Sequence, residues 1–237
     1  MNVGNSHYTF TADINGSIII ERDNIVIDGA NRVLQGTGDL GSSGIDLTGK
    51  SNVTVTNMKI QGFDFGVYLS SASHNVISQN DLTNNYCGIW LEVFSNGNII
   101  SGNTIANNEM YAMWCKDSSD NNISENEITL HGNYTIYIRS SNGNTVSENY
   151  IADNHLGIFL LDGSFDNLLF HNDFVGNREH VSILDSTNVW DNGTTGNYWS
   201  GYEEKYPNAT ELDGSGIWNT PYVIDENNQD NYPLMNR

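Results

Sequence analysis

The chain has 237 residues, 38% of them hydrophobic, and carries 29 Asp and Glu side chains against 9 Lys and Arg, giving a net charge of −20. This charge argues against nucleic acid or an anionic membrane surface as a partner. No segment is long and apolar enough to suggest membrane insertion. The opening residues 1–5 do not resemble a signal peptide. An extracellular, cell-surface or periplasmic location would therefore depend on an export signal absent from this sequence.

Residues 1–23 precede the repeating part of the chain and are expected to form an N-terminal cap, with Tyr8 to Ile20 as the capping segment. Repeat proteins need such caps because an open terminal coil exposes core side chains and unpaired strand edges.

Residues 24–187 carry asparagine at a period of 23 residues. One set is Asn52, Asn75, Asn98, Asn121, Asn144 and Asn167, and a second, five places later, is Asn57, Asn80, Asn103, Asn126, Asn149 and Asn172. A third set is Asn85, Asn108, His131, Asn154 and Asn177. Units of equal length predict a solenoid. Asparagine suits its corners because it tolerates left-handed backbone and its amide bonds neighbouring backbone groups.

Each repeat contains short apolar runs rich in β-branched residues, which indicates strands. In the last run of each repeat, inward pairs such as Ile89/Leu91 alternate with an outward residue. We therefore predict an all-β, single-stranded right-handed parallel β-helix of about eight coils with three strands per coil. Cys87 and Cys115 occupy different places in their coils, so we expect two buried thiols.

Residues 188–237 differ sharply in composition. All three prolines and three of the five tryptophans lie there, at Pro207, Pro221, Pro233, Trp190, Trp199 and Trp218. We expect a loop-rich aromatic C-terminal cap that either closes the last coil or folds back along the rod.

An aromatic residue recurs at the outward position of the third strand. The five are Tyr68, Trp90, Trp114, Tyr137 and Phe159, and two places before each lies a small residue, at Gly66, Gly88, Ala112, Thr135 and Gly157. Such a ladder, with a shallow trough beside it, suits an extended glycan because sugar C–H groups stack on aromatic faces. It also suits plain cross-strand stabilisation, coverage by the C-terminal cap, or a protein or self-association interface.

Charged residues follow two places after three of these aromatics, at Glu92, Lys116 and Arg139. They predict either an exposed ion ladder or a site that neutralises the carboxylate of a uronate sugar. Asp64, Glu109, His131 and His155 lie in turns before the aromatic strand and are candidate bases. None forms a recognised catalytic motif, so we assign no catalytic residue.

Residues 211–219 partly fit a calcium-loop template. The candidate ligands are Glu211, Asp213, Ser215, Asn219 and the Ile217 carbonyl, with Gly216 at the glycine position. Tyr222 stands where the template has a bidentate acid. Ca²⁺ is thus a possible cofactor, whereas copper is disfavoured because the six histidines are scattered along the chain.

Several tracts resemble the NosD-like β-helix family. They are the Asn-x-Ile-Ser-x-Asn units, residues 196–201 (GNYWSG), the ending 213–225 (DGSGIWNTPYVID) and residues 231–234 (NYPL). The resemblance covers nearly the whole chain and implies a right-handed β-helix of extracellular or periplasmic type, related to carbohydrate-binding and sugar-hydrolysis modules. The family takes its name from a copper-linked maturation protein, so membership implies fold more than function.

The preferred hypothesis is an extracellular module that binds an extended polysaccharide or surface glycan along the Tyr68–Phe159 ladder without chemistry. One alternative is a polysaccharide lyase, epimerase or hydrolase acting on the same face. The other is a structural cell-surface spacer or assembly module whose aromatic face meets protein.

Overall fold

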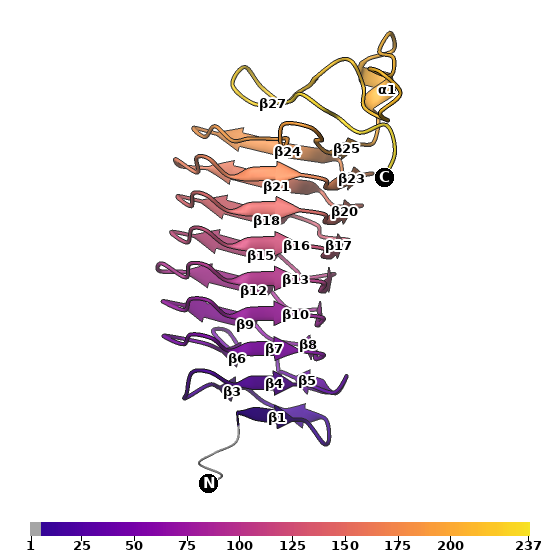
Figure 1. Ribbon diagram of the computed structural model, residues 1–237. Helices are drawn as coiled ribbons and strands as arrows, with labels where there is room; N and C mark the ends of the chain where they lie inside the picture. Colours follow the sequence, from indigo (N-terminus) through magenta and orange to yellow (C-terminus); the bar gives the residue numbers. More distant parts are fainter. Residues whose placement is uncertain (1–5) are drawn as a thin grey trace.

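The computed structural model describes residues 6–237 and shows a rod of stacked coils (Figure 1). Three parallel sheets run along it. Sheet A comprises β1 (His7–Thr9), β4 (Val26–Asp28), β7 (Thr54–Thr56), β10 (Val76–Ser78), β13 (Ile99–Ser101), β16 (Asn122–Ser124), β19 (Thr145–Ser147) and β22 (Leu168–Phe170). Sheet B comprises β2 (Ile14–Asn15), β5 (Val33–Gln35), β8 (Lys59–Gln61), β11 (Asp81–Thr83), β14 (Thr104–Ala106), β17 (Glu127–Thr129), β20 (Tyr150–Ala152), β23 (Asp173–Val175) and β25 (Tyr198–Trp199).

Sheet C comprises β3 (Ile18–Ile19), β6 (Ser43–Asp46), β9 (Phe65–Ser70), β12 (Cys87–Glu92), β15 (Tyr111–Lys116), β18 (Tyr134–Arg139), β21 (Leu156–Leu161) and β24 (Glu179–Leu184). The C-terminal part adds α1 (Tyr202–Lys205) and the antiparallel pair β26 (Tyr222–Val223) and β27 (Gln229–Asp230). The predicted right-handed, three-sheet solenoid of about eight coils is confirmed.

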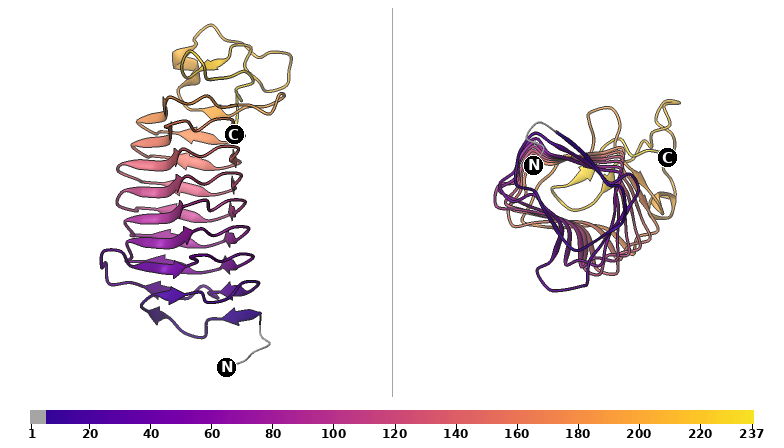
Figure 2. Two further views of the ribbon diagram at one scale, coloured as in Figure 1. Left: turned by 90° about the vertical axis from the view of Figure 1, so that its left-hand side faces the viewer. Right: turned by 90° about the horizontal axis from the view of Figure 1, so that it is seen from below.

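The core lies inside the outline formed by the superposed coils (Figure 2). Each sheet contributes one or two inward columns of aliphatic side chains, which are fully buried through the middle coils. Ile77, Ile100 and Ile123 in sheet A are in register between neighbouring coils. The inward pairs that the sequence predicted in sheet C are buried from Ile45 to Leu160. Cys87 and Cys115 are free, buried thiols, as expected.

Buried asparagines connect each coil to the next. Asn121 Oδ1 accepts hydrogen bonds from Asn98 N at 2.8 Å and from Asn98 Nδ2 at 3.1 Å. Asn121 donates in the same way to Asn144 Oδ1, at 2.9 and 3.1 Å. The second and third asparagine sets form equivalent ladders. Because a buried amide costs free energy when unpaired, each ladder fixes the register of successive coils.

The left-handed backbone is not at the ladder asparagines but at the residue immediately before each one. Asp120 has a φ of 57° ahead of Asn121, and Gly143 has a φ of 64° ahead of Asn144. The expectation that asparagine is selected for its left-handed backbone was therefore wrong in these coils. Its side-chain amide, which both donates and accepts along the stack, is the reason for its recurrence.

The first asparagine of two sets lies outside the ladders. Asn75 Oδ1 accepts from Val53 N at 2.9 Å, and Asn80 Oδ1 accepts from Met58 N at 3.1 Å. Val53 and Met58 therefore occupy the buried corner positions that asparagine fills in later coils. The 23-residue period had instead selected Asn52 and Asn57, one place earlier. Asn52 and Asn57 have left-handed φ values of 54° and 53°, like the residues that precede the ladder asparagines in later coils. The coil from Val53 to Asn75 is one residue shorter than the period, which the sequence pattern concealed.

A serine ladder, which the sequence analysis missed, crosses the corner after sheet C. Ser118 Oγ accepts from Ser95 N at 3.1 Å, and Ser118 N donates to Ser141 Oγ at 3.0 Å. Each serine hydroxyl thus accepts a backbone hydrogen bond from the coil before it, as the asparagine amides do. The period of 23 between these serines was a sufficient signal.

The ends of the rod differ from each other. From His7 onward, the segment expected as an N-terminal cap forms three strands that pair with β4, β5 and β6. The C-terminal part lies across the opposite end of the rod (Figures 1 and 2). There Trp199 stacks on Phe174 with ring centroids 4.5 Å apart, and Tyr222 stacks on Trp199 at 4.2 Å. The core is thereby continued into the cap.

Two cap residues terminate the first two asparagine ladders. Asn188 N donates to Asn228 Oδ1 at 2.9 Å, and Asn197 N donates to Asp230 Oδ2 at 2.7 Å. Asp230 also accepts from Trp199 Nε1 at 2.8 Å, and its burial raises the pKa of the carboxyl to about 6. The cap therefore supplies the acceptors that a further coil would otherwise provide.

Replacing a ladder asparagine should destabilise the rod strongly. In Asn121→Ala, the buried Asn98 N–H and amide lose their acceptor, so we expect a loss of about 2–4 kcal/mol in the free energy of unfolding. Asn122→Ala, at an exposed neighbouring position, should change stability by less than about 0.5 kcal/mol. Urea titrations compare the two variants. Similar losses in both would contradict the ladder account.

His131 should make the rod acid-sensitive. Its Nδ1–H donates to Asn154 Oδ1 at 3.2 Å and its Nε2 accepts from Asn108 at 3.3 Å, which requires neutral imidazole. Burial lowers its pKa from 6.5 to about 4, so between these values the unfolded chain binds the proton and the native state does not. Stability should therefore fall as pH drops through this window, by at most about 3 kcal/mol.

His131→Asn, which restores the ladder residue, should lose less stability than the wild type between pH 7 and pH 4.5. Asp230 contributes with the opposite sign because burial raises its folded pKa, but that contribution is common to both proteins. Equal pH dependence in the two proteins would refute the assignment to His131.

Candidate functional site

The outward face of sheet C carries the predicted aromatic column. Strands β9, β12, β15, β18 and β21 contribute one ring each, and parallel pairing places the rings in register along the rod. Tyr137 is 8% exposed, and the other four are half-buried. We call this set, Tyr68, Trp90, Trp114, Tyr137 and Phe159, the first column.

The central rings of the first column stack on one another. Trp90 and Trp114 have centroids 4.6 Å apart and planes at 11°, and Trp114 and Tyr137 are 4.2 Å apart at 3°. Rings in successive coils can lie this close and parallel only if their planes lie across the rod axis. Both faces of Trp114 are therefore covered by neighbouring rings. This ring presents its edge to a ligand, contrary to the expectation that it offers a face.

A second outward column, which the sequence analysis missed, lies three places before the first. Its members in register are Phe65, Cys87, Tyr111, Tyr134 and Leu156. Tyr111 and Tyr134 are half-buried. Cys87 and Leu156 are buried, so the second column adds rings to the aromatic face only at Phe65, Tyr111 and Tyr134. Alternation along the strand would place these residues inward, which is why the pattern was missed.

The column of small residues is not a surface trough. A Cβ at Gly88 would meet the Ile105 side chain at 2.8 Å, and one at Gly66 would meet the Leu82 side chain at 3.0 Å. Ala112 and Thr135, in the same column, are fully buried. These residues point into the core and turn the chain so that the place before them faces outward. They are small because the core leaves no space.

The ring planes of the tyrosines in the second column are nearly perpendicular to those of the stacked rings in the first column. Tyr111 makes 71° with Trp114 at 4.9 Å, and Tyr134 makes 74° with Tyr137 at 5.6 Å. Tyr111, Tyr134 and Phe159 are nearly parallel to one another, at 15° and 17°, with centroids 5.8 and 5.6 Å apart. Their planes run along the rod, so neighbours in this row do not cover each other's faces.

The indole N–H groups support this arrangement. Nε1 of Trp90 and of Trp114 is buried without a hydrogen-bond partner. Tyr111 lies perpendicular to both indoles, at 82° and 71°. A perpendicular ring can offer its electron-rich face to the positive edge of an indole. One face of Tyr111 can thereby accept the indole N–H groups of the stacked rings. Tyr86 also contacts the Tyr111 ring, at 76° with centroids 6.4 Å apart.

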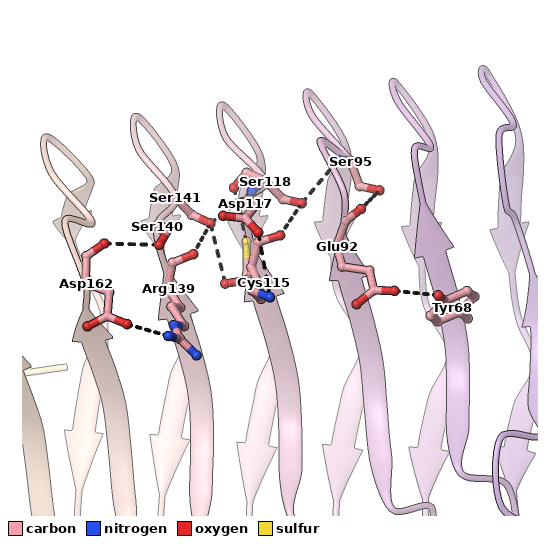
Figure 3. Close-up of polar contacts among 11 residues, drawn as sticks. Tyr68, Glu92, Ser95, Cys115, Asp117, Ser118, Arg139, Ser140, Ser141 and Asp162 are labelled. Atoms are coloured by element: carbon pink, nitrogen blue, oxygen red, sulfur yellow. Dashed lines mark hydrogen bonds and ion pairs between the residues drawn. The ribbon is translucent and has the colours of Figure 1, made fainter.

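The charged residues beside the first column do not form the predicted ion ladder (Figure 3). Glu92 accepts a hydrogen bond from Tyr68 Oη at 2.6 Å. Lys116 Nζ lies 3.8 Å from Asp117, and Arg139 Nη2 lies 2.7 Å from Asp162. Of the ion pairs within residues 6–237, none joins Glu92 to either cation. Lys116 is paired with the aspartate that follows its own strand, and Arg139 with the aspartate that follows β21 in the next coil. These aspartates reduce the ability of the two cations to neutralise a uronate.

Two tyrosines of the face resist ionisation. Burial, followed by the hydrogen bond to Glu92, raises the pKa of Tyr68. Burial also raises the pKa of Tyr111 to about 12. Both side chains are therefore neutral hydroxyls at physiological pH. Tyr111 can donate a hydrogen bond to a sugar oxygen, whereas the Tyr68 hydroxyl already donates to Glu92.

The candidate bases separate into different environments. Asp64 and Glu109 line a groove of about 330 Å³ with Tyr86, at the corner that precedes sheet C. Asp64 Oδ2 accepts from Gly41 N at 2.6 Å. His131 is buried in the third asparagine ladder, whereas His155 is exposed. The structure therefore places two carboxylates, but neither histidine, in a groove next to the aromatic face.

The candidate calcium ligands lie in a hairpin turn at the outer end of the cap. Glu211 accepts from Gly216 N at 2.8 Å, and the Ile217 carbonyl accepts from Leu212 N at 2.8 Å. Asn219 Oδ1 accepts from Thr210 N at 3.1 Å. Asp213 and Ser215 are exposed at the tip of the turn. A Ca²⁺ site here stays a prediction, with three of its five oxygens already accepting hydrogen bonds.

The described part of the chain contains no group of three or more His, Cys, Asp or Glu side chains arranged to hold a metal ion. Nor does it contain a helix long and apolar enough to span a membrane.

The C-terminal cap leaves the aromatic face uncovered. Its aromatic residues pack over the end of the core, on Phe174, and not against the first column. Arg237 reaches back along sheet B, where it lies over Tyr150 at 5.7 Å. Of the two expected positions for the cap, the one observed is at the end of the last coil, not along the rod.

Right-handed coils, three parallel sheets and ladders of buried amides define the protein as a parallel β-solenoid. The chain belongs to the NosD family, since the family model described as periplasmic copper-binding protein (NosD) matches residues 3–204. A Pseudomonas aeruginosa protein described as "Probable ABC transporter binding protein NosD" is 36% identical over 77 residues, or 32% of this chain and 17% of that protein.

Two solved structures share the fold at low sequence identity. The Dettilon tailspike protein matches with a TM-score of 0.62 and 14% identity, over 84% of this chain and 49% of the tailspike chain. A double mutant of the periplasmic alginate epimerase AlgG matches with a TM-score of 0.54 and 18% identity, over 75% of this chain and 47% of its own. The chain thus spans about half the length of these proteins, and the likeness shows the fold alone.

The calcium hypothesis can be tested by thermal unfolding in Ca²⁺ and in a chelator. If the turn binds the ion, Ca²⁺ at a hundred times its Kd should stabilise the protein by about 2.7 kcal/mol. Asp213→Ala should remove that gain, whereas Glu204→Ala in α1 should retain it. A melting temperature that does not change on chelation would rule out the site.

Proposed function

We propose that the aromatic face of sheet C binds an extended polysaccharide along the rod. The observation that carries this proposal is the row of turned rings, Tyr111, Tyr134 and Phe159. Their faces are not covered by one another, and their spacing of 5.6–5.8 Å follows the coils. An extended polymer can meet such a row at several points with its C–H faces.

The first column supports this row through its stacked rings, Trp90, Trp114 and Tyr137, whereas Phe159 belongs to both sets. Its stacked rings hold Tyr111 and Tyr134 upright through perpendicular contacts at 4.9 and 5.6 Å. Tyr68, Glu92 and the tyrosine hydroxyls supply polar groups at the margin. This division of labour differs from the original hypothesis, in which the first column itself stacked on sugar.

Charge favours a neutral polymer over a uronate. The chain has a net charge of −20, Asp64 and Glu109 line the adjacent groove, and Asp117 and Asp162 offset the two cations beside the face. A polyuronate would therefore approach against repulsion at low salt.

We infer a location outside the cytoplasm, either periplasmic or extracellular. The family description as periplasmic and the glycan-binding proposal both favour such a location.

Affinity electrophoresis tests the proposal in gels that contain neutral or uronate polysaccharides. We expect a neutral polymer to retard the wild type most. Tyr134→Ala should weaken the interaction about three- to tenfold, which is typical for loss of one aromatic contact. Tyr150→Ala, a half-buried tyrosine on sheet B, is the matched control.

Retardation that is equal in Tyr134→Ala and Tyr150→Ala would contradict the assigned face. No retardation of the wild type in any gel would contradict glycan binding.

A second function is favoured by the groove that Asp64, Glu109 and Tyr86 line beside the face. Carboxylates next to a bound polymer could support hydrolysis, lyase or epimerase chemistry. Products in a digest of a retarding polymer, lost in Asp64→Asn or Glu109→Gln, would move the protein from a binding module to an enzyme.

A further inference from the structure

Within residues 6–237, β24 is the terminal strand of sheet C and pairs on one side only. Beyond β22 an isolated bridge joins Leu168 to Val189, and β25 extends sheet B beyond β23, but β24 ends sheet C. Val181 and Ile183 occupy the inward columns that Ile158 and Leu160 fill one coil earlier. The earlier pair is fully buried, whereas Val181 and Ile183 are only half-buried. The C-terminal cap therefore leaves part of the core open.

The open edge also presents backbone groups. In the first coils, Leu47 N donates to Tyr68 O of the following coil, and pairing through the sheet puts Ile183 in the column of Leu47. Residues two places apart in a strand direct their backbone groups to the same side. The N–H and C=O groups of Val181 and Ile183 thus point away from β21. Within residues 6–237, no strand pairs with this edge.

Two cavities lie between β24 and the cap segment 222–227, and we call the space that they occupy together the slot. At one end, Glu179, His180 and Val181 face Tyr222, Val223 and Ile224 across a cavity of about 320 Å³. At the other end, Ile183 and residues 185–187 face residues 225–227 across a cavity of about 760 Å³. Figure 1 shows the cap segment that carries β27 passing above β24.

The two ends of the slot differ in charge. The larger cavity is lined by Asp185, Asp225 and Glu226, with no cation among its lining residues. The smaller cavity is lined by Arg178 and Lys205, together with Glu179. A strand that runs parallel to β24 therefore meets acidic side chains as it leaves the slot.

We infer that this slot binds an extended polypeptide segment, which pairs with β24 as a further parallel strand of sheet C. Two apolar side chains at alternate positions of the segment would cover Val181 and Ile183. A Lys or Arg residue after them would meet Asp185 and Glu226. Backbone groups and an apolar alternation are what a β-strand recognises at a sheet edge. This inference does not depend on the aromatic face.

The probe is a labelled peptide, acetyl-Thr-Thr-Ile-Thr-Val-Thr-Lys-Lys-amide, measured by fluorescence anisotropy with the whole chain. In a parallel strand, the two threonines that follow Ile and Val point their N–H groups at β24, whereas Ile and Val point theirs away. Methylating the two threonine nitrogens should weaken binding by at least about fivefold per lost hydrogen bond. Methylating the Ile and Val nitrogens is the matched control and should weaken it less.

The protein variants test the acidic end. Glu226 is exposed in the slot. Glu226→Lys should weaken binding of the lysine peptide and strengthen binding of a peptide that has Glu in place of Lys. Glu204→Lys makes the same charge change in α1, outside the slot, and should leave the affinity for both peptides unchanged. Each of the following outcomes overturns the inference: no binding of the parent peptide, equal effects of the two methylations, or equal effects of the two protein variants.

Discussion

The pairing of one buried amide with the next, coil after coil, is the interaction on which the structure depends. Each ladder asparagine accepts from the coil before and donates to the coil after, as Asn121 does between Asn98 and Asn144. An amide left unpaired inside the rod is costly, so the ladders favour one register. Their ends need partners for the same reason, and Asn228 and Asp230 of the cap supply them.

Because the ladders align successive coils, they also determine which side chains meet on the outer faces of the sheets. Because successive coils are in step, single residues of β12, β15 and β18 become a stack with ring separations of 4.2–4.6 Å. The tight inward turn at Ala112 and Thr135 brings a second residue of β15 and β18, Tyr111 and Tyr134, to the surface. The aromatic face is thus a consequence of core packing, and its outermost surface consists of the rings that the stack does not cover.

Much of this could be predicted from sequence because the period is regular. Asparagine spacing and the alternation in the third strand were sufficient for the fold, the core columns and Trp90, Trp114 and their neighbours. The second column was not predicted, because Tyr111 and Tyr134 break strict alternation. Ring orientation and the pairing of Lys116 and Arg139 with Asp117 and Asp162 depend on side-chain torsions, which residue spacing does not encode. The shorter coil at Val53 was hidden by asparagines one place away.

The central claim is that Tyr111 and Tyr134, rather than the indoles, offer the accessible ring surface of this face. Photochemically induced dynamic nuclear polarisation measures it directly, because a dissolved flavin polarises only the aromatic side chains that it can reach. The account predicts strong polarisation of Tyr111 and Tyr134 and weak polarisation of Trp90 and Trp114, whose Nε1 atoms are buried. Strong signals from both indoles with silent tyrosines would contradict it.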